Sequence, residues 1–361
     1  MQHADRQAFE IHLFPLAGAR DWMTGYLSNV VDQCHPHVTG IEEAIKQIQD
    51  AELDILVYPD VGMNSTSLRL AAQRLAPIQC AAFGHPVSTG LPSIDYFLSC
   101  NAMEPGDAGD HYTERLITLP GAGVCMPMPA QPAHRKTRED FGLSPNAVVY
   151  LSAQSLFKYL PAYDPLYARI AMEVEDAVFV FAEGEYPAWT RTFRDRLHHC
   201  FNSLGLDPER HVRFVPQQSF DDFLCLNYAS DVFLDTIGWS GGMTAFDALS
   251  CDLPMVVLPG TLMRGRQSYG MLQQMGIEDT IASDVDDYVR IAVKLGLDRE
   301  WRNDVSRRIR ERRHLLFDDT RCVKSLEAFY RWAAGTPQPG DDARFKLWPR
   351  HETDAERPAS P

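Results

Sequence analysis

The sequence predicts an α/β fold with two doubly wound domains that face a cleft. Short apolar runs such as Asp54–Tyr58 and Ala177–Ala182 have the length and composition of strands buried on both faces. Amphipathic segments with helical spacing separate these runs, which favours parallel sheets covered by helices. A stretch from Pro120 to Pro145, rich in proline and without a regular period, lies between the two alternating halves and indicates a crossing between domains.

The spacing of apolar residues predicts each element in order. The expected strands are Phe9–Leu16, Asp54–Tyr58, Ile78–Phe83, Ile94–Leu98, Val148–Ser152, Ala177–Ala182, Val212–Val215, Val232–Asp235 and Met255–Leu258. The expected helices are Ile41–Ala51, Ser67–Leu75, Asp164–Glu173, Ala188–Ser203, Phe220–Tyr228, Met243–Ser250, Val285–Leu295, Asp298–His314 and Thr320–Ala333. We therefore expect an N-terminal lobe over 1–120, a linker over 121–146 and a C-terminal lobe over 147–334. The tail over 335–361 is rich in proline and charge, which predicts disorder.

Composition excludes several classes of function. The 361 residues include 34 basic and 49 acidic ones, and a net charge of −15 argues against binding to a nucleic-acid backbone. The chain shows neither a run of 18 apolar residues nor a signal peptide, so we expect no membrane association and a cytoplasmic protein. The eight cysteines form no CxxC pair and are typical of small buried residues in a reducing compartment.

A loop of small residues follows the expected strand Val232–Asp235 and leads into a helix. Glycines there would allow a phosphate to approach the backbone closely, and the new helix would offer free N–H groups and the positive end of its dipole. Asp247, early in that helix, is a candidate to bind a ribose. The alternative is a tight connection with an N-terminal cap.

Two further loops carry candidate polar residues. Lys158 follows the expected strand Val148–Ser152 and would neutralise a diphosphate as a compact point charge, the alternative being a surface lysine. His85 follows the expected strand Ile78–Phe83 and could bind a sugar or phosphate or transfer a proton. Its alternative is a structural loop histidine.

We expect no metal site and no cofactor. Cys34, His35 and His37 lie close together but lack a second ligand pair, so a solvated loop is the preferred interpretation. The DxD sequence Asp284-Val285-Asp286 is typical of some metal-dependent sugar transferases, but it precedes an expected helix and is interpreted as its cap.

Several linked motifs carry a resemblance to a known family. They are Arg74–Gln79, Gly84–Pro86, Ser88–Gly90 and Ile94–Tyr96 in the first half, and Ala229–Thr236, Pro254–Gly260 and Ile291–Gly296 in the second. In this order and spacing, from about Asp54 to about Trp332, the chain resembles the catalytic region of the O-linked N-acetylglucosamine transferase/SPINDLY family, glycosyltransferase family 41. The bacterial branch of the family is the most similar.

The resemblance implies a GT-B fold with two Rossmann-like lobes and C-terminal helices. It implies an inverting, metal-independent enzyme that moves a sugar, expected to be N-acetylglucosamine from UDP-N-acetylglucosamine, onto protein Ser/Thr. The partners implied are the UDP-sugar and an acceptor protein or peptide. The residues implied are Lys158 and His85 in catalysis, and Gln154, Ser155, Val215, Pro216, Gln217, Gly242, Met243, Thr244, Asp247, Gly84, Pro86 and Arg266 in donor binding.

Within that resemblance, Lys158 would hold the diphosphate, Gly242 to Thr244 would offer N–H groups to it, and Val215 to Gln217 would frame the uracil. A UDP-glucose-dependent N-glucosyltransferase and a GDP-fucose user of the SPINDLY type are the alternative enzymes. A truncated, non-catalytic nucleotide-sugar-binding homologue is a third alternative, because the family's first strand-loop unit, which carries a His-Pro pair, has no counterpart in this chain.

Overall fold

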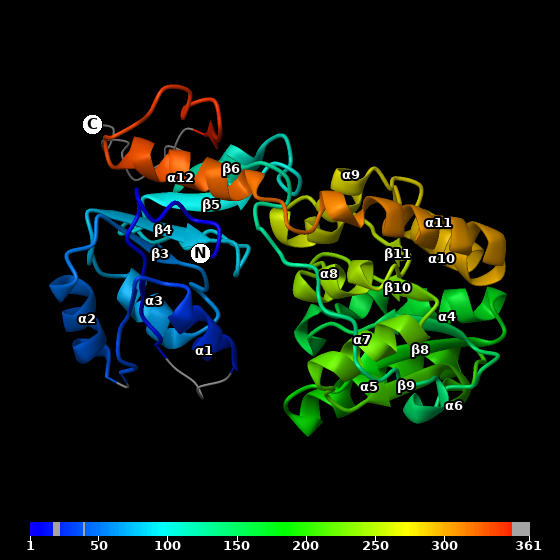
Figure 1. The fold of residues 1–361 in the computed structure, drawn as a ribbon. Coiled ribbons are helices and arrows are strands. Elements are labelled where there is room, and N and C mark those ends of the chain that lie inside the picture. The colour runs from blue at the N-terminus through cyan, green and yellow to red at the C-terminus, as the bar shows by residue number, and fades with distance from the viewer. Residues whose placement is uncertain (17–21, 39, 349–361) are drawn as a thin grey trace, which may run out of the picture. The chain divides into compact units, whose positions relative to one another are not determined.

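The protein forms two compact units, which the ribbon in Figure 1 shows in rainbow colours. The computed structural model describes residues 1–16, 22–38 and 40–348. Unit 1 comprises Met1–Cys125 and Asp319–Pro361, whereas unit 2 comprises Met126–Asp318. Unit 2 is therefore an insertion between two chain segments that together build unit 1. Each unit contains a five-stranded sheet that is wholly or mainly parallel, which confirms the expected α/β class.

The sheet of unit 1 has the strand order β12-β6-β5-β4-β3. Only β12 is antiparallel to its neighbour. Its strands are β3 (Ile55–Tyr58), β4 (Ile78–Ala82), β5 (Tyr96–Cys100), β6 (Arg115–Leu119) and β12 (Lys346–Leu347). A separate parallel pair joins β1 (His12–Leu13) to β2 (Gln33–Cys34). The helices of this unit are α1 (Trp22–Asn29), α2 (Ile41–Asp50), α3 (Ser65–Ala71), η1 (Ala108–His111) and α12 (Arg321–Ala333).

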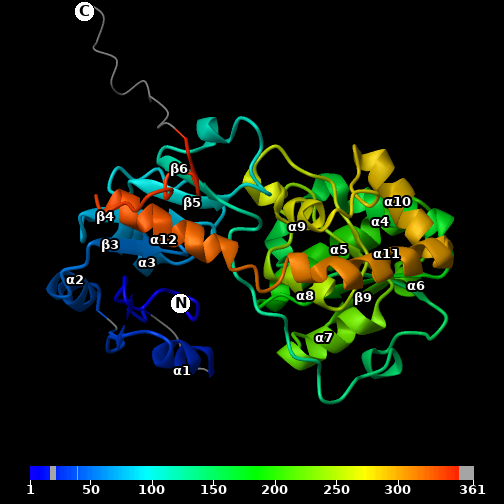
Figure 2. The ribbon, with the colours of Figure 1, turned by 45° about the horizontal axis from the view of Figure 1, so that its top comes forward.

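Successive residues of the central strands in unit 1 point into two different apolar layers. Phe97 and Leu116 pack in the layer that contains residues of α2 and α3. Leu98 and Ile117 pack with Phe329 of α12 in the other layer, and Figure 2 shows α12 running along this sheet. Because both faces of the sheet are covered, its strands are apolar at nearly every position.

Unit 2 has a parallel sheet with the strand order β11-β10-β7-β8-β9. Its strands are β7 (Val148–Ser152), β8 (Ala177–Ala182), β9 (Val212–Val215), β10 (Val232–Leu234) and β11 (Met255–Val256). Its α-helices are α4 (Asp164–Glu173), α5 (Pro187–Ser203), α6 (Pro208–His211), α7 (Phe220–Ala229), α8 (Met243–Ser250), α9 (Gln267–Met275), α10 (Val285–Leu297) and α11 (Arg299–Arg312). Its 3₁₀ turns are η2 (Glu139–Phe141), η3 (Leu156–Lys158), η4 (Pro161–Tyr163), η5 (Met263–Gly265) and η6 (Arg313–Leu315).

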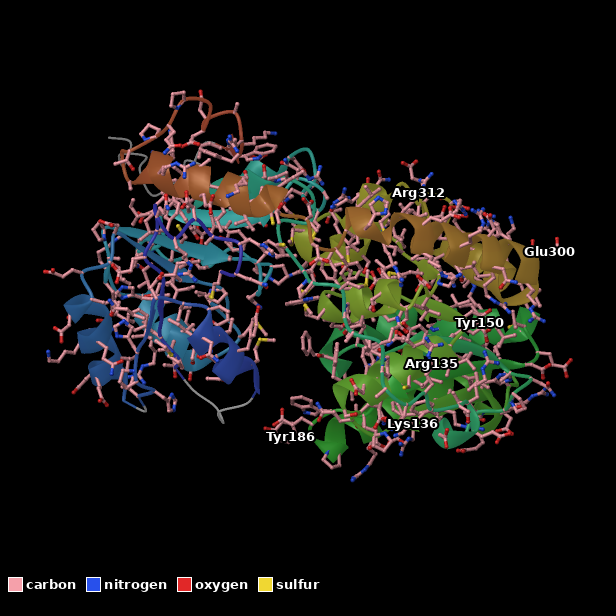
Figure 3. The ribbon with its side chains drawn as sticks, viewed as in Figure 1. Arg135, Lys136, Tyr150, Tyr186, Glu300 and Arg312 are labelled. Atoms are coloured by element: carbon pink, nitrogen blue, oxygen red, sulfur yellow. The ribbon has the colours of Figure 1, made fainter. Side chains whose placement is uncertain are left out.

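An aromatic cluster fills one face of the sheet in unit 2. Phe179 of β8 contacts Tyr150 of β7 and Tyr167 of α4, with ring centroids 5.3 and 5.5 Å apart. The hydroxyl of Tyr150, which Figure 3 labels, donates to the carbonyl of Ala292 in α10 at 3.0 Å. Gly296 leaves room for that hydroxyl, since a Cβ at this position would collide with it. The glycine therefore lets α10 pack closely on the sheet.

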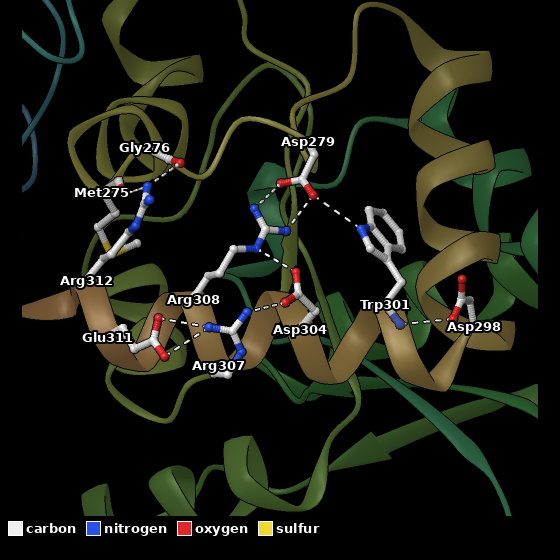
Figure 4. Close-up of polar contacts among 10 residues, drawn as sticks. All are labelled: Met275, Gly276, Asp279, Asp298, Trp301, Asp304, Arg307, Arg308, Glu311 and Arg312. Carbon is white, nitrogen blue, oxygen red and sulfur yellow. Dashed lines mark hydrogen bonds and ion pairs between the residues drawn. The ribbon is translucent and has the colours of Figure 1, made fainter.

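Helix α11 buries Val305 and Ile309 on its apolar side, and a network of polar contacts fixes its polar side (Figure 4). Arg308 donates two hydrogen bonds to the carboxylate of Asp279, which also accepts one from the indole of Trp301. Arg312 donates to the carbonyls of Met275 and Gly276 at 3.2 and 2.9 Å. These carbonyls lie at the C-terminal end of α9, where a cation interacts favourably with the negative end of the helix dipole. Thus α11 holds the C-terminal end of α9.

The structure divides the chain differently from the sequence-based expectation. The expected C-terminal lobe extended to residue 334, but α12 packs on the sheet of unit 1 and belongs to that unit. Residues 126–146, expected to form a linker, belong to unit 2. There Arg138 donates to Asp231 at 2.7 Å and to the carbonyl of Ala229 at 2.8 Å.

The disorder expected for the tail is wrong for residues 335–348. In this segment β12 pairs with β6, and Asp341, which is 2 % exposed, accepts hydrogen bonds from Arg331 of α12. The composition was misleading because a few specific contacts hold the segment, including the packing of Phe345 and Trp348 against the two apolar layers of unit 1. The remaining residues of the expected tail, 349–361, lie outside the described residues.

Other local expectations were also wrong. Only His12–Leu13 of the expected strand Phe9–Leu16 is a strand. Cys34 belongs to β2, and His35 stacks on Phe14 with ring centroids 4.0 Å apart, so this stretch is not simply a solvated loop. By contrast, α4 and α8 have the expected bounds, and Asp284 caps α10 by accepting from the N–H of Asp287 at 2.8 Å. No described helix has both the length and the apolar character required to cross a membrane.

Asp341→Asn should destabilise unit 1 by about 2 kcal/mol, because it weakens two hydrogen bonds to a charged guanidinium. The Arg331 guanidinium lowers the pKa of Asp341 to about 2. Because a lowered pKa stabilises the folded state only while the carboxylate is ionised, this contribution should be complete above pH 4 and lost as the pH falls towards 2. Thermal unfolding between pH 7 and pH 2 would measure both effects.

Asp342→Asn is the matched control, since Asp342 is exposed and directly follows Asp341. If both substitutions change stability equally, the Arg331–Asp341 pair does not hold the segment in place.

Candidate functional site

The strand order of unit 2 reverses between β7 and β10. From β7 the chain proceeds outward through β8 to β9, and it then returns to the other side of β7 to form β10 and β11. The helices that follow β7 and β10 leave on opposite faces, so a crevice opens where the two strands end. The sequence-predicted loops after Ser152 and after Leu234 both begin at this point.

Lys158 lies in η3, directly after β7, and reaches across to the loop after β10. Its Nζ donates to the carbonyl of Ser240 at 2.9 Å and to Oε1 of Gln154 at 3.4 Å. The amide of Gln154 donates to the hydroxyl of Thr244 at 2.7 Å. Burial lowers the pKa of Lys158, and the nearby Asp235 opposes this shift. The structure thus brings together Lys158, Gln154 and Thr244, which the sequence analysis selected from two distant segments.

The beginning of α8 supplies backbone donors at the same crevice. Gly242 precedes the helix, and Met243 and Thr244 are its first residues. The first N–H groups of a helix have no carbonyl partner within the helix and lie at the positive end of its dipole. The glycines allow close packing here, since a Cβ on Gly241 would lie 2.7 Å from Nε2 of Gln154 and one on Gly242 would lie 2.8 Å from Oε1 of Gln267. This arrangement suits an anion.

Asp247 lies one turn further along α8, on the side of the helix that carries Met243 and Thr244. The residue is buried, and burial raises the pKa of its carboxyl to about 6. No charged neighbour contributes to this shift. The carboxylate is therefore costly to keep ionised here, as expected for a group whose partner is a ligand.

Four residues that the sequence analysis did not select complete the site. Asp235, at the end of β10, accepts from the N–H of Gly241 at 2.7 Å. The hydroxyl of Ser240 accepts from the N–H groups of Gln267 and Ser268 at 2.9 and 3.3 Å. An acidic residue directly after the apolar run Val232–Leu234 was the available signal for Asp235. Nothing in the sequence pattern pointed to the start of α9, which was not predicted as a helix.

Ser155 and Arg266, which were also predicted in unit 2, make other contacts than those of the Lys158 ammonium. Ser155 precedes η3, and its carbonyl accepts from the N–H of Lys158 at 3.0 Å. The guanidinium of Arg266 lies 4.4 Å from the ring centroid of Tyr269 and donates to the carbonyl of Gly260 at 3.2 Å.

The segment Val215–Gln217 follows β9, at the edge of the same sheet. The carbonyl of Val215 accepts from Glu183 at 2.9 Å, and that of Pro216 accepts from the side chain of Gln218 at 2.6 Å. These bonds give the turn after β9 a defined backbone conformation at the carboxyl end of the sheet.

The predicted residues of unit 1 lie where β4 ends. Gly84, His85 and Pro86 follow this strand, and the imidazole of His85 packs against Gly62 so closely that a Cβ there would lie 2.6 Å from Cδ2. Gly62 has a φ of +100°, which also favours glycine. The rest of the loop is fixed by buried Glu114, which accepts from the hydroxyl of Ser88 at 2.7 Å and from the N–H of Thr89 at 2.8 Å.

Comparison with solved structures supports the two-lobed GT-B fold. A mutant of the O-GlcNAc transferase of Thermobaculum terrenum matches with a TM-score of 0.80 and 24% identity, over 93% of this chain and 64% of that chain. Sucrose-phosphate synthase of Thermosynechococcus elongatus matches with a TM-score of 0.56 and 14% identity, over 83% of this chain and 80% of that chain. At these identities the likeness concerns the fold.

Comparison with known sequences identifies the family. A probable SPINDLY protein of Solanum lycopersicum, named as a UDP-N-acetylglucosamine–peptide N-acetylglucosaminyltransferase, is 26% identical over 81% of this chain and 32% of its own length. The probable SEC protein of Arabidopsis thaliana is 24% identical over 85% of this chain and 30% of its own length. The chain thus spans about a third of the length of these relatives. The profile of glycosyl transferase family 41 matches residues 128–326, more than half of the chain, and the chain belongs to this family.

Proposed function

We propose that this chain is the catalytic region of a protein glycosyltransferase that moves N-acetylglucosamine from UDP-N-acetylglucosamine to Ser or Thr hydroxyls. The observation that carries the proposal is the convergence of Lys158 and the first N–H groups of α8 at the strand-order reversal of unit 2. A lysine and a helix N-terminus together form a suitable site for a diphosphate. Family membership supports the assignment of that diphosphate to a sugar donor.

The proposed reaction is a single displacement that inverts the anomeric carbon. The acceptor hydroxyl oxygen forms a bond to this carbon, while the bond from the carbon to the diphosphate oxygen breaks and its electron pair stays on UDP. The leaving diphosphate gains negative charge, which the ammonium of Lys158 and the amides of Gly242, Met243 and Thr244 would stabilise. These groups can meet this demand without a metal ion. His85 is our candidate to accept the hydroxyl proton.

The remaining groups would position the donor. Asp247 would accept hydrogen bonds from the ribose hydroxyls, and Val215, Pro216 and Gln217 would frame the uracil. Gln154 and Ser155 would lie beside the diphosphate, Gly84 and Pro86 would line the sugar, and Arg266 would lie in an adjoining segment. A cytoplasmic location suits this function and is supported by the dispersed spacing of the eight cysteines, which include no CxxC pair.

A nucleotide panel tests the proposal directly. We expect UDP and UDP-N-acetylglucosamine to raise the Tm of the protein more than GDP does, and we expect mass spectrometry to detect N-acetylglucosamine on an acceptor peptide. Stabilisation by GDP alone would favour the GDP-fucose alternative, and transfer of glucose to Asn would favour the N-glucosyltransferase. UDP binding without any transfer would favour the non-catalytic homologue, and binding of no nucleotide would contradict every one of these functions.

Lys158→Ala should lower kcat by about 10²- to 10³-fold, the usual effect of removing one group that stabilises developing charge. UDP binding should weaken less than kcat falls, since the charge on the leaving diphosphate increases during the reaction. Lys294→Ala, which removes an exposed lysine of α10, is the control. Near-normal turnover by Lys158→Ala would disprove the assigned role.

Asp247→Asn should weaken UDP binding about tenfold but stabilise the unliganded protein at pH 8 by about 1–3 kcal/mol. Because burial raises the pKa of Asp247 to about 6, the folded state loses stability as the pH rises through that value. Asparagine cannot ionise and so avoids the loss. Thermal unfolding at pH 4 and pH 8 should therefore show a difference only at pH 8.

Asp195→Asn, at an exposed position of α5, provides the reference for a change of charge alone. An equal Tm for wild type and Asp247→Asn at both pH values would contradict the proposed burial of an ionised carboxylate.

A further inference from the structure

The peptide group between Ser240 and Gly241 is held at both ends by ionisable side chains. Its carbonyl accepts from Nζ of Lys158 at 2.9 Å, and its N–H donates to Oδ1 of Asp235 at 2.7 Å. A cation on the carbonyl and an acceptor on the N–H polarise the same amide in the same direction, so each bond strengthens the other. Ser240 and Asp235 are almost completely buried, which limits competition from water for these bonds.

We propose that Asp235 is a positioning residue, which holds this peptide group so that the next N–H groups, those of Gly242, Met243 and Thr244, face the donor diphosphate. The inference deepens the proposed function and relies on it only for the binding measurement described below. Asp235 itself would not touch the donor, since the residue is buried and its Oδ1 already accepts from the N–H of Gly241.

Contacts around the peptide group leave the loop little freedom. The N–H of Ser240 donates to the carbonyl of Arg264 at 2.8 Å, and its hydroxyl accepts from the first two N–H groups of α9. The carbonyl of Gly241 accepts from the hydroxyl of Ser268 at 3.3 Å. Every backbone polar group from the N–H of Ser240 to the carbonyl of Gly241 therefore has a partner within unit 2. The first backbone donor after this fixed stretch is Gly242, where the proposed phosphate contacts begin.

Asp235 is also anchored through its own backbone. Its N–H donates to the carbonyl of Val256 in β11 at 3.1 Å, and its carbonyl accepts from the hydroxyl of Tyr288 at 2.8 Å. The carboxylate thus projects from a rigid strand end rather than from a flexible loop. Burial raises the pKa of Asp235 to about 7, while the Gly241 N–H, the Ser268 hydroxyl and the charge of Lys158 oppose this rise. Burying this carboxyl group destabilises the folded protein, so its presence indicates a role that a neutral apolar residue could not perform.

Two substitutions separate hydrogen bonding from charge. Asp235→Ala removes the acceptor and leaves the N–H of Gly241 without a partner, whereas Asp235→Asn keeps an oxygen at the same place and removes only the charge. We expect calorimetry to show UDP binding about 10- to 100-fold weaker for Asp235→Ala and within about threefold of wild type for Asp235→Asn. Asp231→Ala is the matched control. Asp231 directly precedes the same strand, at its opposite end, and its carboxylate accepts from the N–H of Val149 at 2.8 Å.

Asp231→Ala should lower the Tm but leave the UDP affinity of the folded protein unchanged. Equal UDP affinity for Asp235→Ala and wild type would overturn the proposal. If Asp235→Ala does not fold, Asp235→Asn decides the question, because a purely electrostatic role of Asp235 predicts that removing its charge changes UDP affinity markedly.

Hydrogen–deuterium exchange of the Gly241 amide gives a test that does not require UDP. Exchange should be slow in wild type and Asp235→Asn and at least about tenfold faster in Asp235→Ala. Slow exchange that persists in Asp235→Ala would overturn the inference. If wild type binds no UDP but the exchange pattern is as expected, the proposed function fails while the role of Asp235 in fixing the loop stands.

Discussion

The parallel pairing of β10 with β7 is the constraint on which the rest of unit 2 depends. Val232 and Phe233 lie beside Tyr150 and Leu151, although the paired residues are about 80 positions apart in the sequence. This pairing places the end of β10 beside the end of β7 and reverses the direction in which the sheet grows. The backbone topology alone forms the crevice at the reversal, and the polar side chains around it determine which ligand it can bind.

Function at this crevice requires groups that a stable core would exclude. Lys158, Asp235 and Asp247 are all largely buried, and burial shifts the pKa of each towards its neutral form. Apolar residues would be more stable at such positions in a core, because the desolvation penalty of a buried charge often exceeds the attraction to its partners. The surrounding structure compensates with the aromatic cluster of unit 2 and with α11, which holds the end of α9. The free energy gained from packing in these other parts of unit 2 thus offsets the cost of burying ionisable groups at the site.

The elements and site residues that could be predicted from the sequence are those whose pattern lies within one short segment of the chain. The strands β7 and β8 and the helices α4 and α8 were predicted closely, because each is a continuous apolar run or a clear helical pattern. The strand β6 was missed beside the proline-rich stretch, and α9 was missed because Gly270 and several glutamines dilute its apolar pattern. Lys158 and Thr244 could be selected because they follow strands, but the role of Asp235 depends on how the loop to Gly241 folds back, which spacing along the chain does not encode.

The insertion of unit 2 into unit 1 has a consequence for biosynthesis. A ribosome completes unit 2 as one uninterrupted segment, so this unit can fold as soon as Asp318 has emerged. Unit 1 is different, since the face of its sheet formed by Leu98 and Ile117 is covered by Phe329 of α12. At about 5–20 residues per second, roughly 10–40 s pass between synthesis of those strands and of that helix. During this interval an apolar sheet face is exposed, which makes the nascent chain prone to aggregation and a candidate substrate for a chaperone.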